Sequence, residues 1–350
     1  MHLRAASWLR HRLGRAVVLA YLLALFLPGP GLWLRRPHLL PLTHLTLHTA
    51  PLLLSLVLFS AGLQVPVREL GRLLRHPKAL LAGLVLHLAI PLAVVPFVAL
   101  LLRRTPDSDG GSGLLTAMIL VVAMPVAAGA TVWTDRGDGD QPTMVGLVLA
   151  STLLSPLTTP LLLETLAPLL SGGYGQVLVD TGRLAQSGFG LATVVLPCAA
   201  GLLGALVLSA RWLRRLHGTV TPLALTGSLV LTYVNAGGAL GSVLTRPRPL
   251  LFAAALAVAA VVCLLSFALG RAAARVLRLE AGTASSLTLA CGMNNSSASA
   301  VLITASLPDK PHLLLPVLAY GLLQKTAASR IVTLLRPDPA RDPAPDPHPG

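Results

Sequence analysis

The sequence predicts an all-α, polytopic membrane protein whose chain crosses the bilayer ten times. Of its 350 residues, 54% are apolar and 11% are charged, and the mean hydropathy is +0.75. A soluble domain carries about 25% charged residues, so this chain cannot cover a water-facing surface. Its apolar residues form ten long segments. The connections on one side of the predicted membrane carry more basic residues than those on the other. These observations exclude a soluble enzyme, a disulfide-rich secreted domain and a disordered protein.

Ten segments come close to the roughly 20 apolar residues that a transmembrane helix needs. The predicted spans are 16–34, 45–66, 79–102, 114–134, 142–168, 187–210, 221–243, 250–273, 283–306 and 312–335. The first span follows a basic N-terminal segment, residues 1–15. A cleaved signal peptide is the alternative for this region, but no Ala-x-Ala pattern follows the apolar run. Residues 336–350 are rich in Pro and Asp and predict a disordered tail.

The net charge of +14 predicts the orientation of the chain. In a soluble protein such a charge would suggest nucleic acid as a partner. Here the basic residues stand between apolar runs, with few aromatic residues among them, so we expect the lipid bilayer and no nucleic acid. Seventeen Lys and Arg residues fall on the side of the termini and eight on the other. The positive-inside rule then predicts both termini in the cytoplasm, and a multi-pass protein of the cell (inner) membrane.

Two spans share a pattern that predicts an inverted repeat, with halves at about 16–168 and 187–335. In each, a Met is followed by small residues, then by acidic residues, and finally by a Pro 18 positions later, from Met124 to Pro142 and from Met293 to Pro311. Each is the fourth span of a five-span half, so the second half would have inverted topology. Paired interrupted spans indicate the binding site of a secondary transporter. Close packing of helices at small residues is the alternative.

The candidate binding residues cluster at these interruptions. Five small polar side chains fall within six residues of the ninth span, and in a membrane they must face protein or water. A helix that starts there would also direct its free amide groups at an anion. Hydrogen bonding between helices is the alternative. Thr131 and Asn235 are weaker candidates, and Gly129 and Gly292 would let the two interruptions approach each other. The polar cluster comprises Asn294, Asn295, Ser296, Ser297 and Ser299.

Two ionisable residues inside predicted spans are functional candidates, because buried charge is costly. Lys325 lies about 15 Å from the end of the last span. Its ammonium could attract an anionic substrate, replace a bound cation, or carry a proton if burial favours the neutral amine. Snorkelling to the headgroups is the alternative. His87 could titrate near neutral pH, or serve as a hydrogen-bonded packing residue.

Other chemistries find little support. Cys198, Cys263 and Cys291 all fall in apolar runs without a CxxC pair, which argues against a disulfide framework or a thiolate zinc site. Because the sequence has no P-loop, direct coupling to ATP is not expected. We therefore expect no enzyme and no cofactor beyond a coupling ion, Na⁺ or H⁺. A membrane receptor or an intramembrane enzyme remains the alternative to a transporter.

A set of short motifs follows the predicted spans in order: Leu58-Phe59-Ser60-Ala61-Gly62-Leu63, Pro77-Lys78-Ala79, Met124-Pro125, Gly139-Asp140, Ser151-Thr152-Leu153-Leu154-Ser155-Pro156, Leu196-Pro197, Gly201-Leu202-Leu203 and Gly292-Met293-Asn294-Asn295-Ser296. At these motifs the sequence resembles the bile acid:sodium symporter family, over roughly residues 15–335. The resemblance implies a core domain and a panel domain, with spans 4 and 9 crossing at their unwound centres. It also implies an organic anion substrate, either bile-acid-like or a smaller carboxylate or sulfonate, carried with sodium by alternating access.

The departures from the family pattern concern sodium. Where the family usually has a Glu before the Gly of the span 9 motif, this sequence has Ala290, and the usual Gln is the shorter Asn294. Where the family has a Ser-Asn pair in span 4, this sequence has Ala130 and Thr131. At two span 5 positions where the family has hydroxyl side chains it has Met144 and Val148, and His87 stands in place of the span 3 Gln. Backbone carbonyls of Cys291 and Met293 could remain as ligands. Sodium prefers several oxygens, a carboxylate among them, so ordinary two-sodium coupling is doubtful. An orthodox sodium symporter with other ligands is the alternative.

Overall fold

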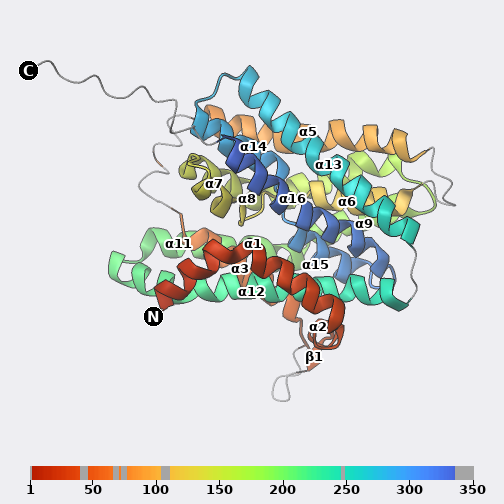
Figure 1. Ribbon diagram of the computed structural model, residues 1–350, viewed down its shortest axis with the longest axis horizontal. Helices are drawn as coiled ribbons and strands as arrows, with labels where there is room; N and C mark the ends of the chain where they lie inside the picture. The colour runs from red at the N-terminus through yellow and green to blue at the C-terminus, as the bar shows by residue number, and fades with distance from the viewer. Residues whose placement is uncertain are drawn as a thin grey trace, which may run out of the picture.

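The computed structural model describes residues 2–39, 46–65, 71, 77–103, 111–245 and 249–335. Helices account for most of this part of the chain. One short antiparallel pair, β1 (His38–Leu39) and β2 (Thr46–Leu47), joins the first helices to the third. Figure 1 shows the helices running roughly side by side, with the start of the first helix and the end of the last helix described at the same end of the molecule.

One group of helices packs around α12 (Ala210–Thr245), the longest helix described. It contacts α1 (His2–Phe26), α2 (Pro28–Arg35) and α3 (Thr49–Leu63), and α3 also packs against α11 (Leu196–Val207). In Figure 1 these helices lie together in the lower part of the view.

Two glycines bring α3 and α11 into backbone contact. A Cβ on Gly62 would lie 2.1 Å from the carbonyl oxygen of Cys198, and one on Gly201 would lie 2.1 Å from that of Phe59. Real Cβ atoms cannot approach an oxygen so closely, so only glycine fits at either position. The Gly62 of the sequence motif therefore serves helix packing, and it fixes α3 and α11 as one unit.

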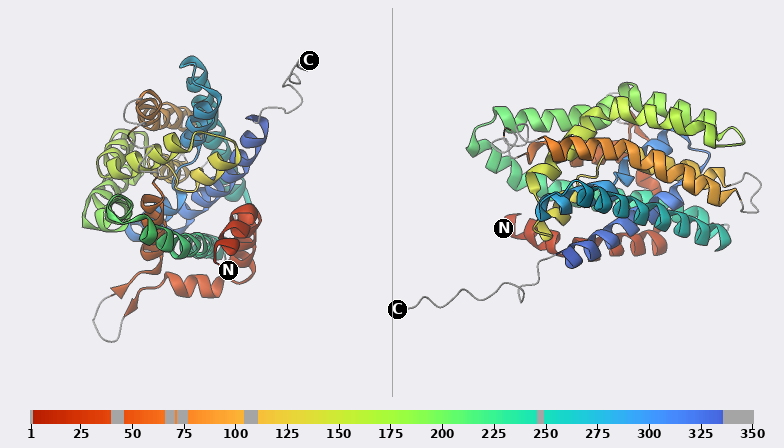
Figure 2. Two further views of the ribbon diagram at one scale, coloured as in Figure 1. Left: turned by 90° about the vertical axis from the view of Figure 1, so that its left-hand side faces the viewer. Right: turned by 90° about the horizontal axis from the view of Figure 1, so that it is seen from above.

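A second group forms the remainder of the bundle. The contacts of α13 with α5, α14 and α16, and of α8 with α5 and α9, hold it together. Seen from above in Figure 2, the long helices of both groups run along the same direction. The members are α5 (Lys78–Leu102), α6 (Ser112–Val122), α7 (Ala130–Arg136), α8 (Gln141–Leu166), α9 (Tyr174–Gln186), α13 (Pro249–Val276), α14 (Ala281–Gly292), α15 (Ser296–Ser306) and α16 (Leu314–Leu335).

Among the described residues, four helical segments are long and apolar enough to cross a membrane: Lys78–Leu102, Gln141–Leu169, Gly188–Val207 and Pro249–Val276. Three more helices are apolar but shorter: Thr49–Leu63, Ser112–Val122 and Ser296–Ser306. The prediction of a helical membrane protein is confirmed to this extent. The ten-span inverted repeat stays a prediction, as does the tail at 336–350, which lies outside the described residues.

The prediction of one continuous helix over 16–34 is wrong, because two helices cover this stretch. α1 already begins at His2, inside the segment predicted as a basic N-terminus, and it ends at Phe26. The following α2 is bent by 92° relative to it. Pro28 and Pro30 start the second helix, and a proline disfavours helical geometry at the residue before it, here Leu27. Together the two helices could still form one broken span.

Two helical segments were not predicted from the pattern of apolar residues. α9 lies in the connection between the fifth and sixth predicted spans, and it is too polar to be read as a span. α12 begins at Ala210 rather than near 221. The apolar pattern did not include its first turns, because they carry Arg211, Arg214 and Arg215. The sixth span also contains a π-helical turn, Leu191–Val195, before α11. Such turns change the helix register and are not visible in hydropathy.

Candidate functional site

The two interrupted helices cross at their non-helical segments. Between α6 and α7, Val126 forms an isolated antiparallel bridge with Asn294, which lies between α14 and α15. The Ala127 N–H donates to the Met293 carbonyl at 2.8 Å, and the Asn295 N–H donates to the Pro125 carbonyl at 2.9 Å. Each interruption thus supplies the backbone hydrogen bonds that the other lacks. The crossing that the sequence resemblance implied is present.

Hydroxyl groups of α8 fix the first interruption. The Val126 N–H donates to Ser151 Oγ at 3.0 Å, and Thr159 Oγ1 donates to the Ala123 carbonyl at 2.9 Å. Both side chains are buried. They satisfy backbone groups that a continuous helix would have paired internally, so α8 holds the interruption in one shape.

The second interruption, between α14 and α15, is fixed by a side chain of α16 and by its own side chains. Tyr320 Oη donates to the Gly292 carbonyl at 3.1 Å and accepts from Asn294 Nδ2 at 3.0 Å. Asn295 is the N-cap of α15, because its Oδ1 accepts from the Ala298 N–H at 3.1 Å. An Asn at this position stabilises a helix start and leaves the first amide groups of α15 available.

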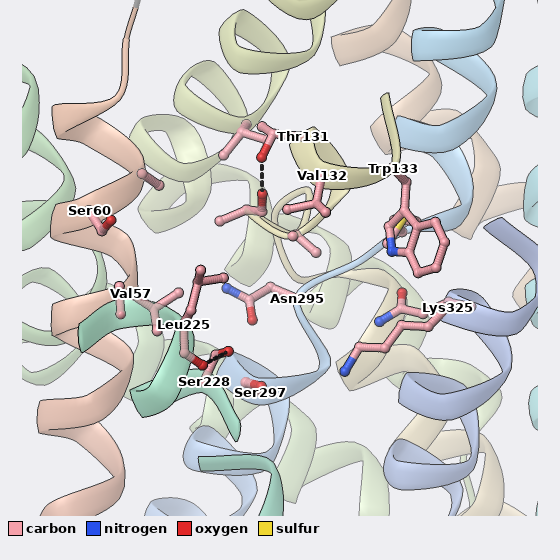
Figure 3. A pocket seen from close by; sticks show the side chains of 18 of the residues that line it. Val57, Ser60, Thr131, Val132, Trp133, Leu225, Ser228, Asn295, Ser297 and Lys325 are labelled. Atoms are coloured by element: carbon pink, nitrogen blue, oxygen red, sulfur yellow. Dashed lines mark hydrogen bonds between the residues drawn. The ribbon is translucent and has the colours of Figure 1, made fainter. Parts of the chain in front are cut away.

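A cavity of about 820 Å³ begins at this crossing. Its walls come from α3, the Ala127–Arg136 segment, the first turns of α8, the middle of α12, the start of α15 and the second half of α16. On α16 the lining extends from Gln324 to Thr333, toward the end at which this helix stops. Figure 3 shows apolar Val57 and Leu225 beside polar Ser60, Ser228 and Asn295 on its walls.

The ammonium group of Lys325 is one of three charged groups that line this cavity. Figure 3 shows its side chain extending from α16 toward Asn295 and Ser297 at the start of α15. Within the part of the chain that the structure describes, no carboxylate pairs with it, and Arg183 with Asp180 is the single salt bridge. A positive charge and a helix N-terminus therefore face the same space, a combination that attracts an anion.

Two further charges line the cavity where α7 ends. Asp135 is exposed, and the Arg136 guanidinium stacks over the ring of Trp133, 4.9 Å from its centroid. Both residues line the cavity, as does the Trp133 ring itself. The lining thus has two cationic groups and one carboxylate, with broad apolar stretches between them. Such a surface suits an amphipathic anion.

Most of the predicted site residues come together in this cavity. Thr131 lines it, although its hydroxyl donates locally to the Ala128 carbonyl at 2.8 Å. Ser296 accepts a long hydrogen bond of 3.4 Å from Gln324 Nε2. The predicted residues that line the cavity are Gly129, Thr131, Met293, Asn294, Asn295, Ser296 and Lys325.

Three predicted residues lie elsewhere. His87 is buried in α5 without a hydrogen-bond partner at Nε2, and Asn235 is buried in α12. Neither lines the cavity, and neither does Cys291, whose side chain packs against Gly270 in the last turn of α14. The Met293 carbonyl already accepts from Ala127 N–H. The structure thus does not place His87 or Asn235 with the other candidates.

The role predicted for two glycines is wrong. A Cβ on Gly129 would meet nothing within 4 Å, so the crossing does not require glycine there. A Cβ on Gly292 would lie 2.4 Å from the ring of Phe267 in α13. Gly292 therefore admits an aromatic side chain from a neighbouring helix, rather than the other interruption.

The sequence analysis missed Tyr320, Gln324 and Ser151. Tyr320 and Gln324 stand on α16 five residues and one residue before Lys325, so Lys325 itself was the signal that could have pointed to this stretch of the helix. Ser151 was seen only as part of a motif. Its contact with Val126 depends on how α8 packs, which spacing alone does not show.

Comparison with known proteins gives a family for this chain. A family model described as the sodium bile acid symporter family matches residues 51–246, which is more than half of the chain. This stretch includes α3, the first interruption, α8 and α12.

Two proteins of Bacillus subtilis (strain 168) are similar over most of their length. One is the uncharacterized protein YbaS, 23% identical over 280 residues, which are 80% of this chain and 86% of the relative. The other is the uncharacterized sodium-dependent transporter YocS, 23% identical over 256 residues, which are 72% of each chain.

Proposed function

Because the chain belongs to the sodium bile acid symporter family, whose members are transporters and not enzymes, we propose that it carries an organic anion across the membrane by alternating access. The observation that carries the proposal is the ammonium of Lys325, which lies in a large cavity beside the start of α15 and has no carboxylate partner among the described residues. Both features favour a negative charge, and the family name and the relative YocS support transport.

The size and lining of the cavity support an anion with an apolar body. Ligand sites for drug-sized molecules measure about 300–1,000 Å³ and are mostly apolar. We propose that the anionic group lies between Lys325 and the first amide groups of α15. The apolar part would then contact Val57, Leu225 and Trp133. A bile-acid-like carboxylate or sulfonate fits this description, and a smaller carboxylate would leave most of the space to water.

We further propose that coupling does not use a pair of ordinary sodium sites. Four of the positions that the family pattern assigns to cation ligands carry apolar side chains, all of them buried: Ala130, Met144, Val148 and Ala290. A hard cation gains nothing from methyl and thioether groups, and it would have lost the carboxylate that balances its charge. Proton coupling, or transport without a coupling ion, would replace it.

The direction of the cavity supports a specific conformational state. The lining follows α16 from Gln324 toward its C-terminal end and reaches Asp135 and Arg136 at the end of α7. If both termini lie in the cytoplasm, as the distribution of basic residues predicts, the cavity opens to the cytoplasm. The described state is then inward-facing, and the crossing closes the opposite side.

The proposal is tested by uptake of labelled taurocholate and pyruvate into proteoliposomes that contain the full chain. Substitution Lys325→Met should raise KM for the accepted anion roughly 10- to 100-fold, because a charge-assisted contact is lost. Lys325→Arg should retain part of the affinity. Lys310→Met is the matched control, since Lys310 stacks on Tyr174 outside the cavity. If the protein takes up neither of the two anions, the proposal is contradicted.

An orthodox sodium symporter is the second candidate, and the printed name of YocS favours it. In that case uptake would depend on a sodium gradient and would fail in potassium chloride. A receptor that does not transport would bind an anion without moving it across the vesicle wall.

A further inference from the structure

The second interruption leaves polar groups in the middle of the bundle that need partners. In a continuous helix the Gly292 carbonyl would accept from the N–H of Ser296, but that N–H donates to the Asn294 carbonyl at 2.8 Å instead. Gly292 and Asn294 are both buried, with 3% of Asn294 exposed. At membrane depth an unpaired backbone or amide group costs several kcal/mol. Something must therefore take the place of the lost helical hydrogen bond.

Tyr320 supplies that partner from α16. Its side chain is fully buried, at 0% exposure. A phenolic hydroxyl has one proton and can accept as well, and here both capacities are used. The proton goes to the Gly292 carbonyl, and the oxygen accepts from Asn294 Nδ2. One hydroxyl thus joins a freed carbonyl and a side-chain amide at the centre of the interruption.

A bound cation could join the same kind of groups by its charge. It would draw carbonyl and amide oxygens together at an unwound helix, and the relative YocS is named for dependence on sodium. Here the amide presents its N–H to Tyr320, and the hydroxyl presents its proton to the carbonyl. We infer that Tyr320 is a positioning residue whose hydroxyl holds the α14–α15 interruption in place of a bound cation.

The same stretch of α16 also positions the anion site. Gln324 Nε2 donates to Ser296 Oγ, and a Cβ on Gly321 would lie 2.8 Å from the same oxygen. Lys325 follows directly and extends into the cavity. The helix that fastens the interruption therefore also carries the ammonium group. The start of α15 and Lys325 stay aligned with each other without an ion.

The test compares Tyr320→Phe with Tyr21→Phe in the purified full chain. Both substitutions remove one hydroxyl that bonds a backbone carbonyl, since Tyr21 Oη donates to the Leu318 carbonyl at 3.1 Å. Tyr21 does not line the cavity. Melting temperatures are measured in sodium chloride and in potassium chloride of equal concentration. The KM for taurocholate uptake is measured in both salts, and this readout alone rests on the proposed function.

We expect the wild type to melt at the same temperature in both salts, because no cation is needed at the interruption. Tyr320→Phe should melt roughly 2–4 °C lower than Tyr21→Phe, since it takes the partner from the Gly292 carbonyl and from the Asn294 amide, whereas the Leu318 carbonyl still has its place in the helical ladder of α16. It should also raise KM about tenfold with little change in kcat, whereas Tyr21→Phe leaves KM unchanged.

Two results would overturn the inference. One is a rise of the wild-type melting temperature that is specific to sodium, which would show that a cation binds the folded protein. The other is a Tyr320→Phe variant that matches Tyr21→Phe in melting temperature. Both results are independent of taurocholate, so a failure of transport alone would count against the proposed function and not against the role of Tyr320.

Discussion

The peptide N–H of Ala127 donates a 2.8 Å hydrogen bond to the carbonyl of Met293, and this bond joins the two interrupted helices. Each residue lies where its own helix has stopped. The bond holds the start of α15 and the α6–α7 connection together, and both line the cavity along with α3 and α12. The position of the candidate anion site follows from this crossing.

The first prediction concerns the stability of the crossing. Ser151→Ala removes the acceptor of the buried Val126 N–H and should lower the free energy of unfolding by about 1–3 kcal/mol. Thr158→Ala is the control, because its hydroxyl is exposed and bonds only within α8. We expect a change below about 0.5 kcal/mol there. Equal melting temperatures for both variants would show that Ser151 does not fix the interruption.

The second prediction concerns the contact of α3 with α11. Gly62→Ala places a methyl group against the Cys198 carbonyl and should prevent close packing, with a loss of more than about 3 kcal/mol or of folded protein altogether. Gly218→Ala should have the opposite sign, because its Cβ would meet nothing within 4 Å and Ala favours a helix by about 1 kcal/mol. Melting curves of both variants in detergent test this difference. A Gly62→Ala protein of wild-type stability would contradict the packing argument.

The third prediction concerns Asp140, which the structure shows as the N-cap of α8. Its carboxylate accepts from the N–H and the hydroxyl of Thr143 and from the hydroxyl of Thr283 in α14. Asp140→Ala should therefore cost about 1–2 kcal/mol of stability. Asp138→Asn, an exposed position at φ 50° that Asn tolerates, should change little. Thermal unfolding distinguishes a cap from a merely solvated loop, for which both variants would behave alike.

The fourth prediction concerns the side on which the cavity opens. The described cysteines, Cys198, Cys263 and Cys291, are all buried, so an added surface cysteine can be labelled selectively. With cytoplasmic termini, Ser329→Cys in the cavity should react with a membrane-impermeant maleimide only in inside-out vesicles. Asp180→Cys in α9 should react only in right-side-out vesicles. The reverse pattern would invert the proposed orientation.

Much of the architecture could be predicted from the sequence, because lipid imposes long apolar runs. The helices at 78–102 and 249–276 match predicted spans closely, and the repeated Met-to-Pro spacing located both interruptions. The bend at Pro28 was hidden by continuous apolarity. Hydropathy measures burial in lipid and not the direction of the helix axis.

The candidate site was predicted only in part, for a related reason. Residues with conspicuous chemistry in an apolar run, such as Lys325 and Asn295, could be found from the sequence, and the cavity contains them. Residues whose role depends on a partner from another helix could not be found. The hydroxyl of Tyr320 becomes informative only once α16 lies against the end of α14.

The most direct test of the account is uptake of labelled taurocholate into proteoliposomes under equal inward gradients of sodium chloride or potassium chloride, for the wild type and for Lys325→Met. The account predicts saturable uptake that is the same in both salts and is strongly reduced in the variant. Uptake that requires sodium and survives the loss of Lys325 would contradict it.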